Sequence, residues 1–430
     1  MLTIASPALG RGAVKPNIVI VVADDMGWRD TGYSGNDIVK TPHLDDMAAH
    51  GMPFDYFYAA QQSCSPGRFA ILTGRAPFRA GQHPLGRIKL QEITLAKALK
   101  TAGYATGHFG KWHVGRGDTS PLKMGFDEAI WRINFYDLGA SLQVGDTSEM
   151  LPMEGDTSVA TMALALDFIR RRAADEQPFF VQVSFGSPHH PHRAAAEFKA
   201  LYQDLIWHEQ DFWGEISGVD AAMGDLRSEL RALGIADDTI VWFTSDNGGI
   251  TKASMDPSGK GKGEVGVRTV GVVEWPAKIE QEMRTSVPAV HMDMYPTLLD
   301  IVGIALPNQP ALDGISLLPL FEGKMTERPK PLGFMLRTST MPGSDGLAEL
   351  DFVRHTQGVW IDGKYKLIVG PSLGERPASV ALYDIFADPA EQTNLAEQHP
   401  ELVQRMRQAL DAWRSSLRAS YDGADFTERQ

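Results

Sequence analysis

The sequence predicts an α/β protein in which a large, mostly parallel sheet lies between helices, followed by a smaller C-terminal α+β domain. Three observations predict this class: apolar runs with the length of buried strands, helical patterns between these runs, and a change of composition near residue 329. Runs of about six apolar residues without polar alternation are typical of strands covered on both faces. Their alternation with helices indicates one sheet with helices on each side.

The predicted central strands cover Asn17 to Asp25, Phe179 to Phe185 and Thr239 to Asp246, and each ends in polar residues. Helical patterns cover 93–102, followed by a glycine suited to the position after a helix, and 158–172. In such sheets, ligands collect beyond the carboxyl ends of the strands. We therefore expect one edge of the sheet to gather Asp24, Asp25, the 186–192 segment, Asp246 and Asn247.

The last hundred residues predict a different arrangement. Short mixed strands, including 358–362 and 365–369, are rich in nearby Pro and Gly, and a final helix is expected over 400–417. We therefore divide the chain into a catalytic domain, residues 1–328, and a small sheet-plus-helix domain, residues 329–430. The stretch 115–152 has weak periodicity, and we expect it to hold substrate loops.

Composition excludes several classes of protein. A formal net charge of -13 argues against nucleic acid as a partner, because binding phosphates requires a broad basic face. No apolar run approaches the roughly 18 residues that cross a bilayer, so no membrane partner is expected. Residues 1–15 lack the apolar centre of a secretory signal, which predicts a cytoplasmic protein by default, or a periplasmic one if a leader has been removed. One cysteine excludes an intramolecular disulfide framework and a multi-cysteine zinc site.

Two pairs of oxygen-bearing side chains follow predicted strands. Asp24 and Asp25 by themselves fit a solvated turn in which Asp25 caps the next helix. The second pair, Asp246 and Asn247, favours a metal site instead, because together the two pairs supply oxygen ligands suited to Ca²⁺ or Mg²⁺. The sequence therefore predicts one divalent cation at the sheet edge.

The most specific pattern surrounds the single cysteine. Cys64-Ser-Pro-Gly-Arg68 is followed by Leu72-Thr-Gly-Arg75. A lone cysteine is more often a small buried hydrophobe than a reactive group. This stretch, however, resembles the signature of the type I sulfatase family, Cys-x-Pro-x-Arg followed by Leu-Thr-Gly-Arg. Position 67 is a glycine where Ser or Ala is more usual, and we expect it to be tolerated because positions 64, 66 and 68 define the signature.

Other segments resemble the same family in the same order along most of the chain. They are the opening strand with Asp24-Asp25, Thr41 to Gly51, Gly107 to His113, Ser187 to His192, Ser245 to Gly249, Gly259 to Arg268, and Leu382 to Leu395. The resemblance implies the alkaline phosphatase-like fold and the hydrolysis of sulfate esters. Its Gly-Lys-Gly element departs from the pattern here, since it is about one residue shorter and has Val265 in place of a glycine.

The resemblance also implies a site and its chemistry. Cys64 would be oxidised to formylglycine by a formylglycine-generating enzyme, and its hydrate would attack sulfur beside a metal held by Asp24, Asp25, Asp246, Asn247 and residue 64. Ca²⁺ is expected, with Mg²⁺ as the alternative. Arg68, Lys111 and Lys260 would neutralise the sulfate oxygens. His189 would protonate the leaving alcohol, with Lys260 sharing this role, and His113 would accept the proton that releases sulfate. Lys262 could take the role of Lys260 at the sulfate, and His190 is the alternative to His189 as the proton donor.

Alternative interpretations remain at this point. Lys111 and His113 lie in a glycine-rich segment that also fits a surface turn, and the 189–192 histidines fit a solvated loop or a transition-metal site. The same formylglycine chemistry would serve a phosphonate or phosphate monoester hydrolase, and a catalytically silent protein could bind sulfated ligands. The expected substrate is a sulfated small molecule or saccharide. Pocket walls could come from 115–160 and from Trp207, His208 and Trp213, which suit stacking or core packing.

Overall fold

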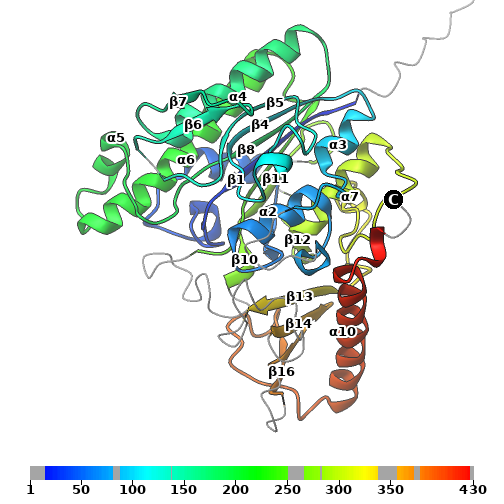
Figure 1. Cartoon of the computed structure of the whole chain (residues 1–430). Coiled ribbons are helices and arrows are strands. Elements are labelled where there is room, and N and C mark those ends of the chain that lie inside the picture. The colour runs from blue at the N-terminus through cyan, green and yellow to red at the C-terminus, as the bar shows by residue number, and fades with distance from the viewer. Residues whose placement is uncertain are drawn as a thin grey trace, which may run out of the picture.

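The computed structural model describes residues 15–80, 88–136, 138–249, 266–280, 283–337, 356–371 and 378–426. Its centre is a nine-stranded sheet in the order β2-β11-β9-β1-β8-β4-β5-β6-β7 (Figure 1). The strands are β1 (Asn17–Ala23), β2 (Met52–Pro53), β4 (Ala105–Lys111), β5 (Glu128–Arg132), β6 (Ser141–Val144), β7 (Met150–Pro152), β8 (Phe179–Ser184), β9 (Thr239–Ser245) and β11 (Gly271–Glu274). The middle strands β9, β1, β8, β4 and β5 are parallel, while β11, β6 and β7 pair antiparallel. The predicted α/β class is confirmed.

Side chains of β1 alternate between two cores on the two faces of the sheet. Ile18 and Ile20 belong to one core, and Val19 and Val21 belong to the other. The first core is completed by α2 (Cys64–Thr73), α3 (Leu95–Lys100), α7 (His291–Val302) and α8 (Leu318–Phe321). The second core is completed by α1 (Pro42–His50), α4 (Thr157–Ala174) and α6 (Trp207–Ala232), with α5 (Ala196–Lys199) against α6. Cover on both faces explains why β1 has an unbroken apolar run from Ile18 to Ala23.

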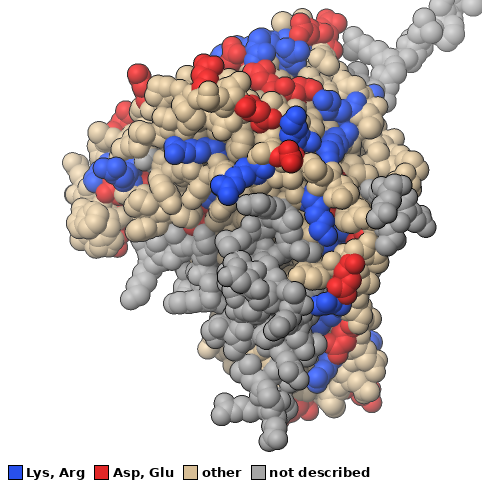
Figure 2. Space-filling view, in the orientation of Figure 1, with Lys and Arg blue, Asp and Glu red and all other residues tan. Residues whose placement is uncertain are grey.

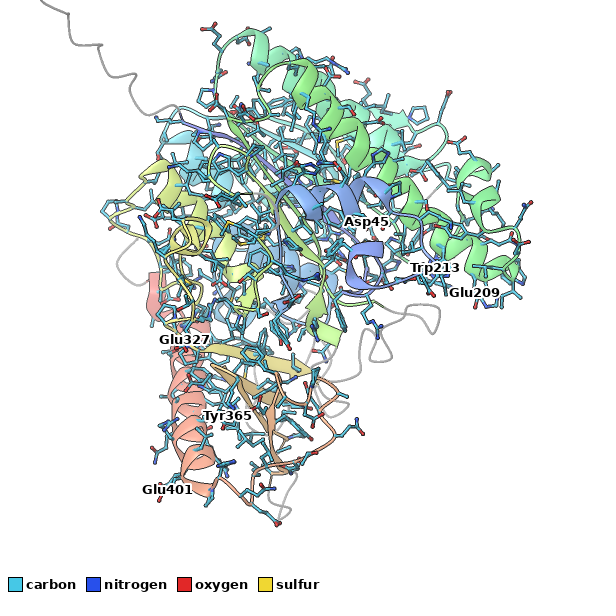
Figure 3. The ribbon with its side chains drawn as sticks, turned by 180° about the vertical axis from the view of Figure 1, so that it is seen from behind. Asp45, Glu209, Trp213, Glu327, Tyr365 and Glu401 are labelled. Carbon is cyan, nitrogen blue, oxygen red and sulfur yellow. The ribbon has the colours of Figure 1, made fainter. Side chains whose placement is uncertain are left out.

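A second, antiparallel sheet follows in the order β13-β14-β15-β16. Its strands are β13 (Leu332–Arg337), β14 (Thr356–Asp362), β15 (Tyr365–Val369) and β16 (Val380–Asp384), and the long α10 (Pro400–Tyr421) packs against it. From behind, Tyr365 and Glu401 mark this lobe, while Asp45 and Trp213 mark the lobe of the central sheet (Figure 3). The domain boundary at 328/329 stays a prediction.

A small sheet lies between the two larger ones. It consists of β10 (Arg268–Thr269), β3 (Phe57–Tyr58) and β12 (Ala289–Val290). Tyr58 and Val290 share a core cluster with Phe334 of β13 and Leu417 of α10. Burial of these apolar side chains joins the C-terminal sheet to the rest of the molecule.

Two segments differ from the sequence expectation. The 107–113 segment is not a surface turn, because β4 is buried along its whole length. Its strand signal is weakened by Gly110, where a Cβ would lie 1.9 Å from the carbonyl oxygen of Ser184. The 115–152 stretch, expected as loops, contains β5, β6 and β7 at one side of the sheet, and these strands are only partly buried. In the described part of the chain, no helix combines the length and the apolar composition needed to span a bilayer.

Candidate active site

The two oxygen-bearing pairs meet because β1 and β9 are neighbours. Ala23 pairs with Ser245 in the parallel register, so the residues that follow both strands lie side by side. The backbone N–H of Asp25 donates to Oδ1 of Asp246 at 3.2 Å, and Nδ2 of Asn247 donates to Oδ1 of Asp25 at 2.6 Å. Ser245 fixes this edge further, since its Oγ accepts a hydrogen bond from the N–H of Met26 at 2.8 Å.

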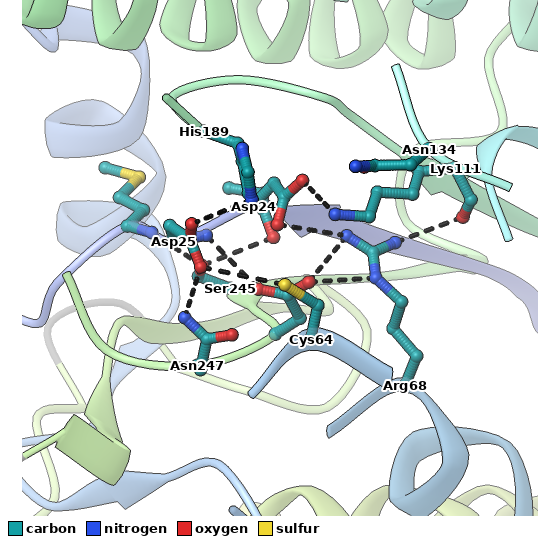
Figure 4. A network of polar contacts seen from close by, with 12 residues as sticks. Asp24, Asp25, Cys64, Arg68, Lys111, Asn134, His189, Ser245 and Asn247 are labelled. Carbon is teal, nitrogen blue, oxygen red and sulfur yellow. Dashed lines mark hydrogen bonds and ion pairs between the residues drawn. The ribbon is translucent and has the colours of Figure 1, made fainter. Parts of the chain in front are cut away.

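Cys64 reaches this edge as the first residue of α2. Its Sγ lies 3.8 Å from Oδ1 of Asp25. One ligand atom from each of Asp24, Asp25, Cys64 and His189 lies within 4.8 Å of the others (Figure 4). The structure therefore brings together the cysteine and the carboxylates that the sequence assigned to one site.

Two buried cations compensate the carboxylates. One turn after Cys64, Arg68 donates through Nε to Oδ2 of Asp246 at 2.8 Å, and its Nη2 lies 2.7 Å from the same oxygen. Lys111, the last residue of β4, forms an ion pair with Asp24, and neither side chain is exposed. Arg68 also donates through Nη1 to the carbonyl oxygen of Lys111 at 3.1 Å, which ties the two cations together.

These pairings set the protonation of the site. Burial alone would raise the pKa of Asp24, but the charges of Lys111 and Arg68 outweigh burial and lower it. Burial would likewise lower the pKa of Lys111, and Asp24 raises it instead. The pKa of the Cys64 thiol is raised well above its usual value, first by burial and then by the nearby Asp246 and Asp24. An unmodified Cys64 is therefore a neutral thiol and not the thiolate that acts as a nucleophile.

Of the predicted histidines, His189 is the one that lies in the cluster. Its Nε2 lies 3.5 Å from Oδ2 of Asp25, and its Nδ1 lies 2.6 Å from the carbonyl oxygen of His190. Because Nδ1 donates to that carbonyl, Nε2 is the nitrogen available to exchange a proton. His190 is exposed, and its ring packs 5.6 Å from His192.

The other predicted site residues are His113, Lys260, Lys262 and the proposed pocket walls. His113 is two residues beyond β4, half-buried, with a φ of 53°. Lys260 and Lys262 lie outside the described residues. Trp213, offered as a pocket wall, is 1% exposed and packs in the core, whereas Trp207 is 71% exposed at the start of α6.

The residues present fit a divalent cation. Oδ1 of Asp24 and Oδ1 of Asn247 are buried, and neither has a hydrogen-bond donor among the described residues. Among the described residues, three carboxylates face two fixed cations here, so this part of the site carries an excess of negative charge. Oxygen donors with excess negative charge are the environment that Ca²⁺ and Mg²⁺ prefer.

Two residues of the segment after β5 lie at the site and were not singled out within the 115–160 stretch offered as pocket walls. The ring of Tyr136 lies 5.4 Å from the ring of His189, and Nδ2 of Asn134 lies 3.4 Å from the hydroxyl of Tyr136. Figure 4 places Asn134 beside Lys111. The stretch that contains them has no clear periodicity, so the pairing of β4 with β5 that brings them to the site left no signal in the sequence.

Comparisons with known proteins point to one family. Residues 16–304 match the model of the Sulfatase family, and residues 263–416 match the model described as N-sulphoglucosamine sulphohydrolase, C-terminal. The chain is 34% identical to N-acetylgalactosamine-6-sulfatase of Canis lupus familiaris over 374 residues, which cover 76% of this chain and 71% of that protein. It is 29% identical to arylsulfatase A of Homo sapiens over 462 residues, covering 92% and 87% of the two chains.

A solved structure shares the fold. The crystal structure of Ps i-CgsB in complex with k-i-k-neocarrahexaose superposes with a TM-score of 0.82 at 24% identity, covering 93% of this chain and 92% of that chain. The family match spans the strands that carry the clustered carboxylates and the cysteine helix. The chain belongs to the sulfatase family, and it is a hydrolase of sulfate esters.

Proposed function

We propose that this sulfatase uses formylglycine, formed from Cys64, beside one divalent cation held by Asp24, Asp25, Asp246 and Asn247. The observation that carries the proposal is the position of Cys64 against Asp25, where burial and carboxylates keep the thiol protonated. A thiol in this position is a poor nucleophile. Oxidation of the Cys64 side chain to formylglycine would instead place a reactive group beside the carboxylates and the proposed cation.

Charge supports the cation. Among the described residues, Asp24, Asp25 and Asp246 outnumber Arg68 and Lys111, so these groups by themselves would repel a sulfate ester. When bound, a divalent cation would draw charge from the sulfate oxygens, and hydrated formylglycine would supply the attacking hydroxyl. We assign Ca²⁺, with Mg²⁺ as the alternative, because every proposed protein ligand is an oxygen donor.

The chain's own residues would hold the substrate and move protons. Arg68 and Lys111 point into the cluster and would contact the sulfate oxygens as charge builds on them. His189 would give the proton at Nε2 to the departing alcohol, because its Nδ1 is engaged by the carbonyl of His190. His113 would accept the proton that accompanies sulfate release. Lys260 as partner of His189, and Lys262 and His190 as substrate contacts, remain part of the proposal.

The proposed substrate is a sulfated saccharide or another sulfated small molecule. Support comes from the name of a relative, N-acetylgalactosamine-6-sulfatase. The proposed macromolecular partner is a formylglycine-generating enzyme. Because Cys64 is only 3% exposed, that enzyme would have to reach it before α2 packs onto the sheet.

Peptide mass analysis combined with sulfate release tests this proposal. Protein coexpressed with a formylglycine-generating enzyme should show the mass loss of thiol-to-aldehyde conversion at position 64 and should hydrolyse 4-nitrophenyl sulfate. The Cys64→Ser variant should fold but lack turnover. Chelation should abolish turnover, and Ca²⁺ or Mg²⁺ should restore it. An enzyme that turns over with an unmodified cysteine would overturn the proposal, as would faster hydrolysis of phosphonate or phosphate esters than of sulfate esters.

A further inference from the structure

A cavity of about 740 Å³ has Asn134 among its lining residues. Asn134 also lies beside Lys111 of the cluster (Figure 4). The lining of the cavity comes from the 115–152 stretch that was expected to hold substrate loops. The lining segments are the η3 turn (Gly117–Thr119), the end of β5, and the hairpin of β6 and β7. Figure 2 shows Lys and Arg side chains gathered over this face, with a few acidic side chains among them. Neither the metal ligands nor the proposed proton donor line this cavity.

The cavity joins the reactive centre through the end of β5. Lys111 and Arg132 are register partners at the carboxyl ends of β4 and β5. Arg132 and Asn134 line the cavity, and Tyr136, two residues further on, packs its ring against His189. A substrate whose sulfate ester reaches Cys64 would therefore extend along 132–136 into the cavity.

Three cations line the cavity. They are Arg116, Lys123 and Arg132, and all three side chains are exposed. Within the described ranges, none of these three has a carboxylate within ion-pair distance. The Arg132 side chain donates a hydrogen bond from Nη1 to the carbonyl oxygen of Ser141 at 3.2 Å, which leaves its charge without a carboxylate partner among the described residues.

The acidic residues of the cavity do not cancel these cations. Asp118 and Asp146 also line it, and Asp146 accepts a hydrogen bond from Ser120 at 3.0 Å. The lining therefore has a net positive charge in a chain whose overall charge is -13. A local positive field against this background selects for an anionic group on the ligand.

Amide groups complete the lining. Oδ1 of Asn134 is buried, and no described residue donates a hydrogen bond to it. Gln143 also faces the cavity, and its Nε2 donates to the carbonyl oxygen of Gly145 at 3.1 Å. An unmade hydrogen bond at a buried acceptor is costly, so a group that donates to Oδ1 of Asn134 would be stabilised there.

We infer that this cavity binds a second anionic group, sulfate or carboxylate, on a polyanionic saccharide whose sulfate ester lies at Cys64. The inference rests on the proposed position of the reactive centre and names the class of its substrate. Arg116, Lys123 and Arg132 contact the second anion, and Asn134 accepts a hydrogen bond from a sugar hydroxyl. The wild-type enzyme thus prefers a sulfated sugar with a second anion over its congener with one anion.

The experiment compares kcat/KM for matched pairs of sulfated sugars. Each pair consists of two hexosamines or two disaccharides that differ at one position. In one set of pairs a sulfate is present or absent, and in the other set a carboxylate replaces a neutral group. The two kinds of anion are therefore tested separately. The variants are Arg116→Gln, Lys123→Gln, Arg132→Gln and the triple variant. Arg405→Gln on α10 is the matched control, because it also removes one exposed positive charge, far from the cavity.

Each single substitution should reduce the preference for the doubly charged sugar by roughly two- to fivefold, and the triple variant by roughly tenfold or more. Raising the ionic strength from about 0.05 M to about 0.5 M should reduce it in the wild type, because the contacts are exposed. Arg405→Gln should keep the wild-type preference. Equal kcat/KM for both members of every pair, or a preference unchanged in the triple variant, would overturn the inference. Those results would occur in protein that carries formylglycine at position 64 and still hydrolyses 4-nitrophenyl sulfate. The proposed function fails instead if turnover occurs with an unmodified cysteine, if phosphonate or phosphate esters are hydrolysed faster, or if no sulfate ester is hydrolysed.

Discussion

The backbone carbonyl of Asp246 lies so close to Gly67 that a Cβ atom at position 67 would be 2.0 Å from the carbonyl oxygen. At this contact α2 crosses the end of β9. The close approach places Cys64 on one side of Gly67 and Arg68 on the other, both beside Asp246. A side chain at position 67 would push the helix and the strand apart.

Gly67→Ala should therefore damage the site as well as the fold. We expect a loss of about 1–3 kcal/mol in the free energy of unfolding, because backbone rather than a flexible side chain is in the way. Metal affinity and turnover should also fall, since Asp246 moves relative to Cys64. Gly103→Ala is the control: it has φ of 85° but open space around it, so it should cost stability without lowering turnover per folded molecule. Thermal unfolding measures the loss of stability, a metal titration measures the loss of affinity, and a sulfate-release assay measures turnover.

Replacing Lys111 by methionine should leave Asp24 and Asp25 buried with one cation fewer. Removing one partner of a buried pair costs about 3–5 kcal/mol, whereas an exposed pair contributes about 1 kcal/mol or less. Turnover should fall by about 100-fold or more if Lys111 also contacts the sulfate. Lys100→Met, whose partner is Asp127 at the surface, is the matched control. Similar unfolding free energies for the two variants in metal-free buffer would contradict the buried-pair explanation.

Strands β1, β8 and β9 could be predicted because each contains a run of apolar residues, such as Ile18 to Ala23 in β1. The carboxylates could be placed because each pair directly follows such a strand. Tyr136 and Asn134 could not, since they reach the site only through the pairing of β4 with β5. The sequence could predict that a glycine at position 67 is tolerated. It could not predict the close contact of Gly67 with the Asp246 carbonyl, because this contact depends on how α2 packs against the end of β9.

His189→Gln should separate substrates by their leaving groups. An alkyl or sugar alcohol is a poor leaving group and needs a proton, so kcat should fall by about 10²- to 10⁴-fold. 4-Nitrophenolate leaves without a proton, so its kcat should change much less. The measurement is kcat for both classes of ester in wild type and variant. Equal losses for both classes would show that His189 positions the substrate and does not donate the proton.

His108 should make the protein less stable in acid. Its ring is buried between Trp112 and Phe126, and burial, followed by the charge of Arg68, lowers its pKa to about 3. The folded pKa lies below the unfolded value of about 6.5, so the unfolded chain binds a proton first as the pH falls. The stability that depends on neutral His108 is complete above about pH 6.5 and declines between that pH and about 3.

His108→Met removes this proton uptake. Its free energy of unfolding should therefore fall less steeply with decreasing pH, by up to about 1.4 kcal/mol per pH unit within that window. Denaturant titrations at pH 4, 5, 6 and 7 measure the difference between the two proteins, in which the carboxylates common to both cancel. Parallel curves would mean that His108 is not the titrating group.

The bond from the N–H of Asp25 to Asp246 joins residues 221 positions apart in the chain. During synthesis, an emerging chain that ends before Asp246 lacks two of the proposed cation ligands, Asp246 and Asn247, so the complete cation site cannot form in the early steps of folding. The cation can bind all of its ligands only after β9 has paired with β1, and binding then stabilises the pairing of these two central strands. Chelation should accordingly loosen the central strands before the outer ones, an order that amide hydrogen exchange would record.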